Sequence, residues 1–247
     1  MKLRLLPALA SLLLLTSAAE APAFAVTGFH PYLRVDQGGS GFRMTDVNGN
    51  IDETKTAFQN AGAETDFHKI GSGIGPSGSA GLWLLPFLRA GVTYGTHRSK
   101  TRNDAADLGA GYYYLDQMDL QVREVGAEAA VRFSRLAGLT IGAHTARTKA
   151  NATEHVTIWD LAGVYTTDGY ANRTRMSFGG FVGLEQTNPA GIVGFVHFGF
   201  THRDMGHMPS TVTESDGVTT TTSSGRTSWM DYSGYYLKAG VGFDVIH

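Results

Sequence analysis

Cysteine is absent from the 247-residue sequence, and long apolar runs are absent beyond residue 25. A chain without cysteine forms no disulfide. It also cannot carry a lipoprotein anchor, which requires a cysteine at the cleavage point. No segment after residue 25 reaches the roughly 20 apolar residues of a transmembrane helix, and amphipathic helical periodicity is scarce. The sequence therefore argues against a disulfide scaffold, a lipoprotein and a helical membrane protein.

Residues 1–25 have the features of a secretory signal peptide. Lys2 and Arg4 precede a leucine-rich apolar segment, and an Ala-Phe-Ala stretch at its end fits the small-x-small cleavage pattern. Pro22 helps to make the apolar segment too short for a membrane anchor. We therefore predict export, with a mature domain at residues 26–247.

A strong excess of one charge sign is also lacking. The whole chain has 20 basic and 22 acidic residues, and removing Lys2, Arg4 and Glu20 with the signal peptide leaves 18 and 21. This balance argues against binding to nucleic acid, because phosphate backbones are neutralised by a surplus of lysine and arginine.

The sequence is rich in glycine, with 32 residues, and it carries 13 Phe, 10 Tyr and 3 Trp. Many of these residues lie on segments that alternate between apolar and polar positions, which indicates β-strands with one apolar face. The clearest segment runs from Tyr235 to Val245, and a strand this regular must pair with a neighbour. The predicted strands cover residues 29–37, 69–84, 87–96, 120–133, 139–147, 175–186, 192–202 and 235–245.

Short and long connections alternate between the predicted strands. Tight turns are predicted around Pro86 and at residues 134–138 and 187–191, whereas the other connections are polar and roughly 20 to 30 residues long. The long connections contain the hairpin signals Asn48-Gly49, Asp168-Gly169 and Asp216-Gly217. Inside the second predicted strand we expect a bulge or kink at Pro76, because proline cannot donate a ladder hydrogen bond.

The chemistry of the two strand faces distinguishes a barrel from a β-sandwich. One face carries bulky apolar residues and the other carries glycine and charge, so the apolar face is expected to contact lipid. We predict an all-β fold, a transmembrane antiparallel up-and-down β-barrel with short periplasmic turns and long extracellular loops. Eight strands are predicted, or ten if the first long connection adds a hairpin.

The last predicted strand also carries a recognisable motif. Lys238, Gly240, Phe243 and Val245 fit the polar-x-Gly-x-x-hydrophobic-x-hydrophobic β-signal of outer-membrane proteins. The whole mature chain resembles the small OmpA/OmpX-type outer-membrane barrels. The resemblance implies a monomer in the cell outer membrane that is assembled by the barrel assembly machinery. Such chains often end on an aromatic residue, whereas this one continues to His247.

Strand parity places a set of charged and polar side chains inside the barrel. The interior of an eight-stranded barrel is only wide enough for side chains, so these charges must pair with one another. We predict a network that plugs the lumen, and a narrow ion-conducting path is the alternative. The set comprises Arg34, Asp36, Arg89, Glu124, Glu128, Arg132, Glu185, His144, His197, Lys238 and Asp244.

Two further motifs each lack a required residue. Residues 46–53 alternate oxygen-bearing side chains as a calcium loop does, but Ile51 stands where that loop needs glycine, so we prefer an Asn-Gly hairpin tip. Lipid A deacylase barrels carry a His-x-Ser-Asn pattern at the rim. Here His202 is followed by Arg203 and Asp204, so the nucleophile is missing. We expect no metal, no cofactor and no enzymatic activity.

These features predict a non-enzymatic outer-membrane barrel that serves envelope structure or surface interaction through its long loops. Outer-membrane lipid and lipopolysaccharide are the expected partners. The rim cations His202, Arg203, His207 and Arg226 are candidates for binding lipopolysaccharide phosphates. A narrow pore and a lipid A-modifying enzyme are the alternative functions.

Overall fold

The computed structural model describes residues 29–107, 109–133 and 138–245. The predicted signal peptide, most of the turn predicted at 134–138, and His247 lie outside the described residues.

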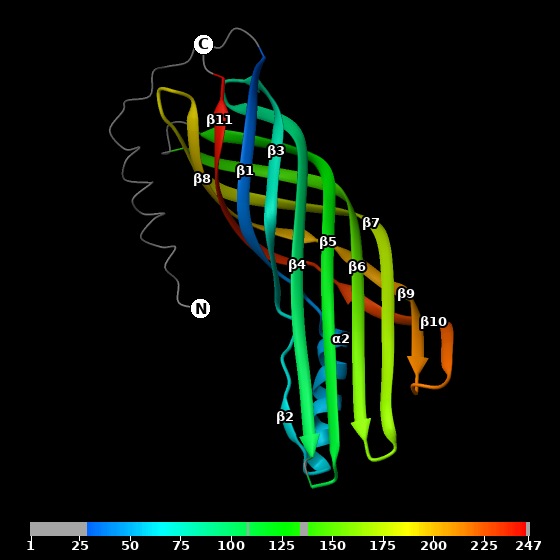
Figure 1. Cartoon of the computed structure of the whole chain (residues 1–247). Helices are drawn as coiled ribbons and strands as arrows, with labels where there is room; N and C mark the ends of the chain where they lie inside the picture. Colours follow the sequence, from blue (N-terminus) through cyan, green and yellow to red (C-terminus); the bar gives the residue numbers. More distant parts are fainter. Residues whose placement is uncertain (1–28, 108, 134–137, 246–247) are drawn as a thin grey trace.

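Eight antiparallel strands form a closed ring (Figure 1). Strand β1 pairs with β11, from Tyr32 opposite Asp244 to Ser40 opposite Tyr236, so the last strand closes the ring on the first. The predicted eight-strand up-and-down barrel is thereby confirmed, and the ten-strand alternative is wrong. The ring strands are β1 (His30–Gly41), β3 (Ser72–Leu85), β4 (Leu88–Asp107), β5 (Tyr112–Phe133), β6 (Leu139–Asp160), β7 (Gly163–Thr187), β8 (Ile192–His202) and β11 (Gly234–Asp244).

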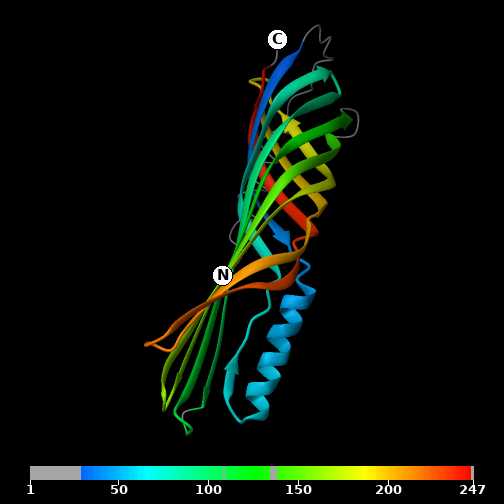
Figure 2. The ribbon, with the colours of Figure 1, turned by 90° about the vertical axis from the view of Figure 1, so that its right-hand side faces the viewer.

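Four of the strands continue beyond the ring. Strands β4 to β7 are 20 to 25 residues long and project past it as a sheet, which we call the extension. Strand β9 (Asp204–Ser215) follows β8 and pairs with the outer part of β7, and β10 (Thr220–Asp231) leads back into β11. The first connection contains α2 (Thr45–Asn60) and β2 (Glu64–Asp66). Figure 2 shows α2 alongside one face of the extension.

Much of the chain predicted as long polar loops is therefore strand or helix. Asp216-Gly217 does form the turn between β9 and β10, but Asp168-Gly169 lies inside β7, and the β6–β7 turn is at 161–162. The predicted hairpin tip at Asn48-Gly49 is also wrong, because both residues lie in α2.

Tertiary contacts explain why α2 forms despite its weak sequence pattern. Val47 and Ile51 are buried on one side of the helix. The Asn48 side chain accepts a hydrogen bond from the Ile70 backbone N–H and donates one to the Ile70 carbonyl. These contacts with the segment just before β3 outweigh the low helix propensity of asparagine and glycine.

Pro76 does not produce the expected bulge. It stays in register opposite Gln37 of β1, while the β3–β4 ladder passes from Ile74–Arg98 to Ser77–Gly95 without a register shift. The missing N–H therefore leaves a local gap in one ladder, and the shift in this hairpin occurs instead near Trp83.

The ring is apolar outside and polar inside. Leu33, Val92 and Leu237 are each more than half exposed on the outer surface, whereas Arg34 and Arg89 are fully buried inside. No helix in the described part of the chain has the length and apolar character needed to span a membrane.

The extension has its own apolar core, which packs between the sheet, α2 and the β9–β10 hairpin. We call it the extension core. It contains Phe42, Met44, Val47, Ile51, Ile70, Met118, Leu120, Val122, Ala150, Ala152, Ala171, Met205, Met208, Met230 and Tyr232.

Candidate functional site: the interior of the ring

The predicted lumen residues lie inside the ring and form two groups. The group nearer the short turns is centred on Glu185, and we call it the turn-side network. Glu185 accepts a hydrogen bond of 2.6 Å from Nη1 of Arg89 and lies 2.9 Å from Nε2 of His197. Its Oε2 is also 3.6 Å from Nη2 of Arg34. One fully buried carboxylate thus contacts two arginines and a histidine.

The rest of the turn-side network spreads across the ring from Glu185. Arg34 donates to Asp244 at 2.7 Å, and Arg132 lies 3.4 Å from the other oxygen of Asp244. Glu128 accepts a hydrogen bond of 3.0 Å from the Tyr32 hydroxyl. These contacts link β1, β4, β5, β7, β8 and β11, so the network bridges opposite walls of the ring.

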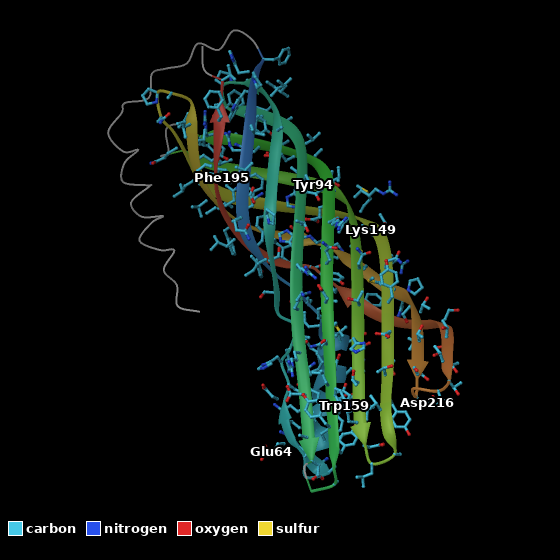
Figure 3. The ribbon with its side chains drawn as sticks, viewed as in Figure 1. Glu64, Tyr94, Lys149, Trp159, Phe195 and Asp216 are labelled. Carbon is cyan, nitrogen blue, oxygen red and sulfur yellow. The ribbon has the colours of Figure 1, made fainter. Side chains whose placement is uncertain are left out.

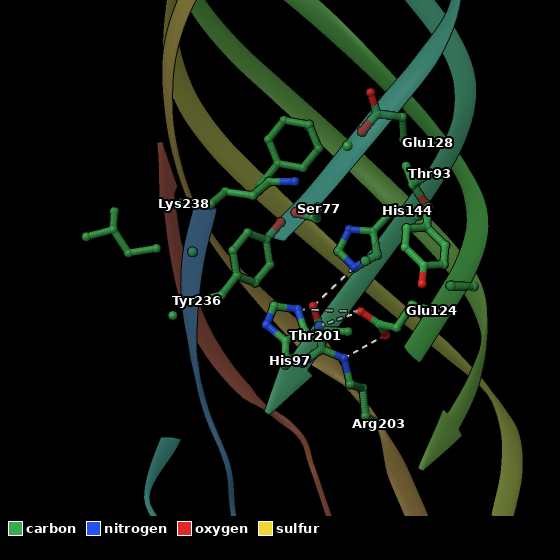
Figure 4. Close-up of a pocket in the computed structure, with 18 residues that line it drawn as sticks. Ser77, Thr93, His97, Glu124, Glu128, His144, Thr201, Arg203, Tyr236 and Lys238 are labelled. Atoms are coloured by element: carbon green, nitrogen blue, oxygen red, sulfur yellow. Dashed lines mark hydrogen bonds and ion pairs between the residues drawn. The ribbon is translucent and has the colours of Figure 1, made fainter. Parts of the chain in front are cut away.

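The second group lies toward the extension and is centred on Glu124; we call it the extension-side network (Figure 4). Arg203 donates to both Glu124 oxygens, at 2.7 Å from Nε and 2.8 Å from Nη2. Thr148 and Ser177 donate to Oε1 of the same carboxylate. This bidentate arginine–carboxylate geometry is the strongest form of the ion pair.

Asp36 and the histidines complete the extension-side network. Asp36 lies 3.5 Å from Nζ of Lys238 and accepts a hydrogen bond from Ser77. Nε2 of His144 is 3.1 Å from the Thr201 hydroxyl. Between the two networks is a cavity of about 60 Å³, lined in part by Glu128 and Lys238.

Each of the sequence-predicted lumen residues contributes to one of these networks. Among the titratable members, the prediction missed His97, whose Nε2 lies 4.0 Å from Glu124, and Arg203, which it placed among the rim cations. Arg203 is in fact buried, at 3% exposure, because it neutralises Glu124. The same parity rule would have found it, since residues 197, 201 and 203 are all buried on one face of the chain.

Arg203 also balances the charge of the interior. The predicted set held four cations, Arg34, Arg89, Arg132 and Lys238, against the five carboxylates of Asp36, Glu124, Glu128, Glu185 and Asp244. With Arg203 the numbers are equal. Buried charges cost least when each has a partner, so this balance favours a filled and static interior.

The predicted assembly motif lies in β11, and its residues face different surroundings. Phe243 points outward and is about half exposed. A Cβ on Gly240 would lie 2.1 Å from the Val35 carbonyl oxygen and 2.7 Å from the Asp36 side chain. Any substitution of Gly240 would therefore disturb the pairing of β1 with β11 directly. Phe243 is the better position for testing the assembly motif, which stays a prediction.

The described residues contain no cluster of three or more histidine, cysteine or acidic side chains able to hold a metal ion. At the predicted rim, His202 contacts Ser233 at 3.2 Å and packs against Phe178. His207 is exposed beside Trp229, and the Arg226 side chain lies outside the described residues.

One hydroxyl–imidazole–carboxylate arrangement lies on the extension, away from the lumen. Nδ1 of His155 is 2.6 Å from Asp168, and its Nε2 is 3.0 Å from the Thr157 hydroxyl. This order of groups is the one that activates a nucleophile in hydrolases. Thr157, however, is only 6% exposed, so its hydroxyl is poorly presented to a substrate.

No family model and no curated protein matches this sequence. Similar solved structures include Neisserial surface protein A, at 15% identity over 88% of this chain and 99% of that chain, with a TM-score of 0.44. A major outer membrane protein from Thermus thermophilus has 12% identity, coverage of 87% and 99%, and a TM-score of 0.46. The outer membrane protease OmpT from Escherichia coli has 10% identity, coverage of 92% and 99%, and a TM-score of 0.46. At these identities the similarity concerns the fold alone, which the strand registers establish independently.

Proposed function

We propose that this protein is a non-enzymatic barrel of the outer membrane that does not conduct ions and acts through its extension. The outward apolar surface of the ring supports the membrane location, because large exposed apolar areas are rare on soluble proteins. Phe198, Leu237 and Val182 are each at least half exposed on this surface. The charged outer face of the extension suits a water-exposed region beyond the membrane.

The balanced interior is the observation that carries the non-conducting part of the proposal. Two ion-pair networks cross the ring, and the extension core lies beyond them along the same axis. An ion would have to break pairs such as Arg89–Glu185, whose side chains are 1% or less exposed, and then pass an apolar core. Both steps oppose permeation.

The extension carries the interaction part of the proposal. Its strands are held by continuous ladders, for example from Lys100–Asp119 to Asp107–Tyr112, rather than by flexible loops. A rigid sheet presents a fixed surface, so a partner loses little entropy from ordering it on binding. Envelope structure and surface contact are the roles that such a projection fits.

The experiment is to refold residues 26–247 in detergent, compare boiled and unboiled samples on a gel, and then record planar-bilayer currents. We expect a heat-dependent mobility shift and no stepwise conductance. A soluble chain with no shift would overturn the membrane location. Stepwise currents from shifted protein would instead support the narrow-pore alternative.

A hydrolase is the second candidate, and the Thr157–His155–Asp168 arrangement is the observation that favours it. The test is labelling of the refolded protein with a fluorophosphonate probe, with Thr157→Val as the control. We expect no labelling, because Thr157 is buried. Labelling that disappears in Thr157→Val would make the protein an enzyme and overturn the non-enzymatic proposal.

A further inference from the structure

Five cationic side chains form a patch on the outer face of three neighbouring strands, which we call the basic patch. It contains Arg98, Lys100, Arg123, Arg147 and Lys149. All five are exposed, and they come from β4, β5 and β6. Figure 3 marks Lys149 on β6, where the strand passes from the ring into the extension.

Most of the positive charge in the basic patch has no acidic partner. Asp119 pairs with Arg98 and lies 3.7 Å from Nζ of Lys100. Among the described residues no carboxylate pairs with Arg123, Arg147 or Lys149. Arg123 also stands directly opposite Lys149 in the β5–β6 register. Like charges in that position repel each other, so an anion bound between them would relieve the repulsion.

The patch lies at the edge of the apolar surface of the ring. Arg147 is opposite Val125 on one side and Met176 on the other, and both apolar side chains are at least 60% exposed. Arg98 is likewise opposite the exposed Ile74. An acyl chain resting on Val125 and Met176 would bring its headgroup to the level of Arg147.

The patch is confined to one side of the barrel. Along the described lengths of β1, β3, β8 and β11, the outward positions hold no lysine or arginine. They carry residues such as Gln37, Ile74, Phe198 and Leu237. Beyond the ends of β1 and β3 stand the exposed cations Arg43 and Lys69, and Lys69 is paired with Asp52. The cluster of neighbouring cations on β5 and β6 without carboxylate partners among the described residues therefore indicates a localised ligand.

We propose that the basic patch binds the phosphate groups of a phosphorylated glycolipid of the lipid A type in the outer leaflet. Guanidinium groups from two strands match phosphate oxygens with paired N–H donors, and Lys149 adds a point charge. The apolar residues beside Arg147 hold the acyl chains. This inference rests on the proposed membrane location. It places the lipopolysaccharide contact on β4, β5 and β6, and not at the predicted rim residue Arg203, which is buried.

The test uses the mature chain refolded in detergent and native mass spectrometry of lipid retention. The probes are bisphosphorylated lipid A, the same lipid without phosphates, and inorganic pyrophosphate. The variant is Arg123→Gln/Arg147→Gln/Lys149→Gln. Its matched control, Arg43→Gln/Lys55→Gln/Lys69→Gln, removes the same charge from the region around α2.

We expect the wild-type protein and the control to retain bisphosphorylated lipid A at least tenfold better than the patch variant does. The wild-type protein should also prefer it at least tenfold over the dephosphorylated lipid. Equal retention of the two lipids, or of lipid A by patch variant and control, would overturn the proposal. Pyrophosphate bound as tightly as lipid A would also overturn it by indicating a free-anion site.

The heat-dependent gel mobility of the refolded protein distinguishes a failure of this inference from a failure of the proposed function. A wild-type protein without the mobility shift would refute the membrane barrel. A protein that shows the shift but retains phosphorylated and dephosphorylated lipid equally would refute only lipid binding by the basic patch. Equal retention of phosphorylated and dephosphorylated lipid by the wild-type protein would overturn the proposal even if the patch variant failed to fold.

Discussion

The ring and the extension are built from the same strands but have opposite chemistry. In the ring, the side chains that face inward are charged and those that face outward are apolar. In the extension, the inward side chains form an apolar core apart from polar groups such as Asp116, and the outward ones are mostly charged or polar. Strand β5 crosses both regions, so it shows where the change occurs.

The inversion in β5 falls between residues 123 and 125. Toward the turns, Val125 is outward and Glu124 and Glu128 are inward; toward the extension, Arg123 is outward and Leu120 is inward. The alternation of side chains never shifts, because the strand pairs continuously with β4 and β6. The surroundings alone decide which face is apolar: lipid outside the ring, or α2 and the hairpin inside the extension.

This difference predicts unequal responses to mutation in the two regions. The ring interior depends on buried ion pairs, in which losing one partner leaves the other charged and unpaired. The extension depends on apolar burial inside and tolerates charge outside. Matched variants in the two regions can therefore test the contrast.

The largest effect is expected at the centre of the turn-side network. Glu185→Ala leaves Arg34 and Arg89 buried without their shared carboxylate. Breaking a buried pair in this way costs about 3–5 kcal/mol of unfolding free energy. Urea unfolding of the refolded barrel, followed by its gel mobility, would measure the loss.

Two comparison variants sharpen that experiment. Asp119→Ala breaks the exposed pair with Arg98 on the extension and should cost much less, because water replaces the lost partner. The double variant Arg89→Met/Glu185→Leu removes both charges of one pair and should recover part of the loss. Equal destabilisation by Glu185→Ala and Asp119→Ala would contradict the view that the ring interior is held by desolvated ion pairs.

The polarity inversion also explains how much of the fold could be predicted from sequence. The strands predicted at 87–96, 120–133 and 139–147 all exist, but the structure extends them to 88–107, 112–133 and 139–160. Each predicted strand has one end close to the inversion. The prediction followed a single apolar face, and the apolar residues on that face give way to charged ones at the inversion. The alternation itself continues with the faces exchanged.

The parts of the interior that sequence did not reveal depend on tertiary contacts. Strand parity predicted the charged residues of the lumen, including those around Glu185. It did not predict which of these charges form ion pairs with one another. Arg203 was missed because it follows the last residue of β8, where a strand pattern ends. Helix α2 was missed because its stability comes from Ile70 and the extension core rather than from its own sequence.

An intermediate effect is expected from placing charge on the outer face in the two regions. Ala129 faces outward in the ring between Ala90 and Ala143, whereas Thr153 faces outward in the extension beside Asp119. Ala129→Arg puts a cation into lipid and should cost about 2–4 kcal/mol. Thr153→Arg should stay within about 0.5 kcal/mol of wild type. Similar losses in vesicle-embedded protein would show that the extension also contacts lipid.

A smaller effect than that of Ala129→Arg is expected from a carboxyl group inside the extension. Asp116 is 5% exposed and accepts one hydrogen bond from Asn103, while its Oδ1 has no partner in the part of the chain that the structure describes. Burial raises the pKa of Asp116, and the Asn103 hydrogen bond opposes the shift only in part. Unlike the ring carboxylates, this one has no cationic partner among the described residues to compensate for its desolvation.

A raised pKa in the folded state means that the folded extension binds more protons than the unfolded chain. Its stability should therefore fall as pH rises from the usual aspartate range through the raised pKa of Asp116. Asp116→Asn keeps an acceptor for Asn103 but removes the titration, and at neutral pH it should gain about 1 kcal/mol. Hydrogen exchange of the β5 amides, corrected for intrinsic rates, would measure both effects, with the ring amides as internal reference. If the stability of the extension depends on pH in the same way in wild type and Asp116→Asn, the charge of Asp116 is compensated. The contrast between the ring and the extension would then not extend to buried carboxylates.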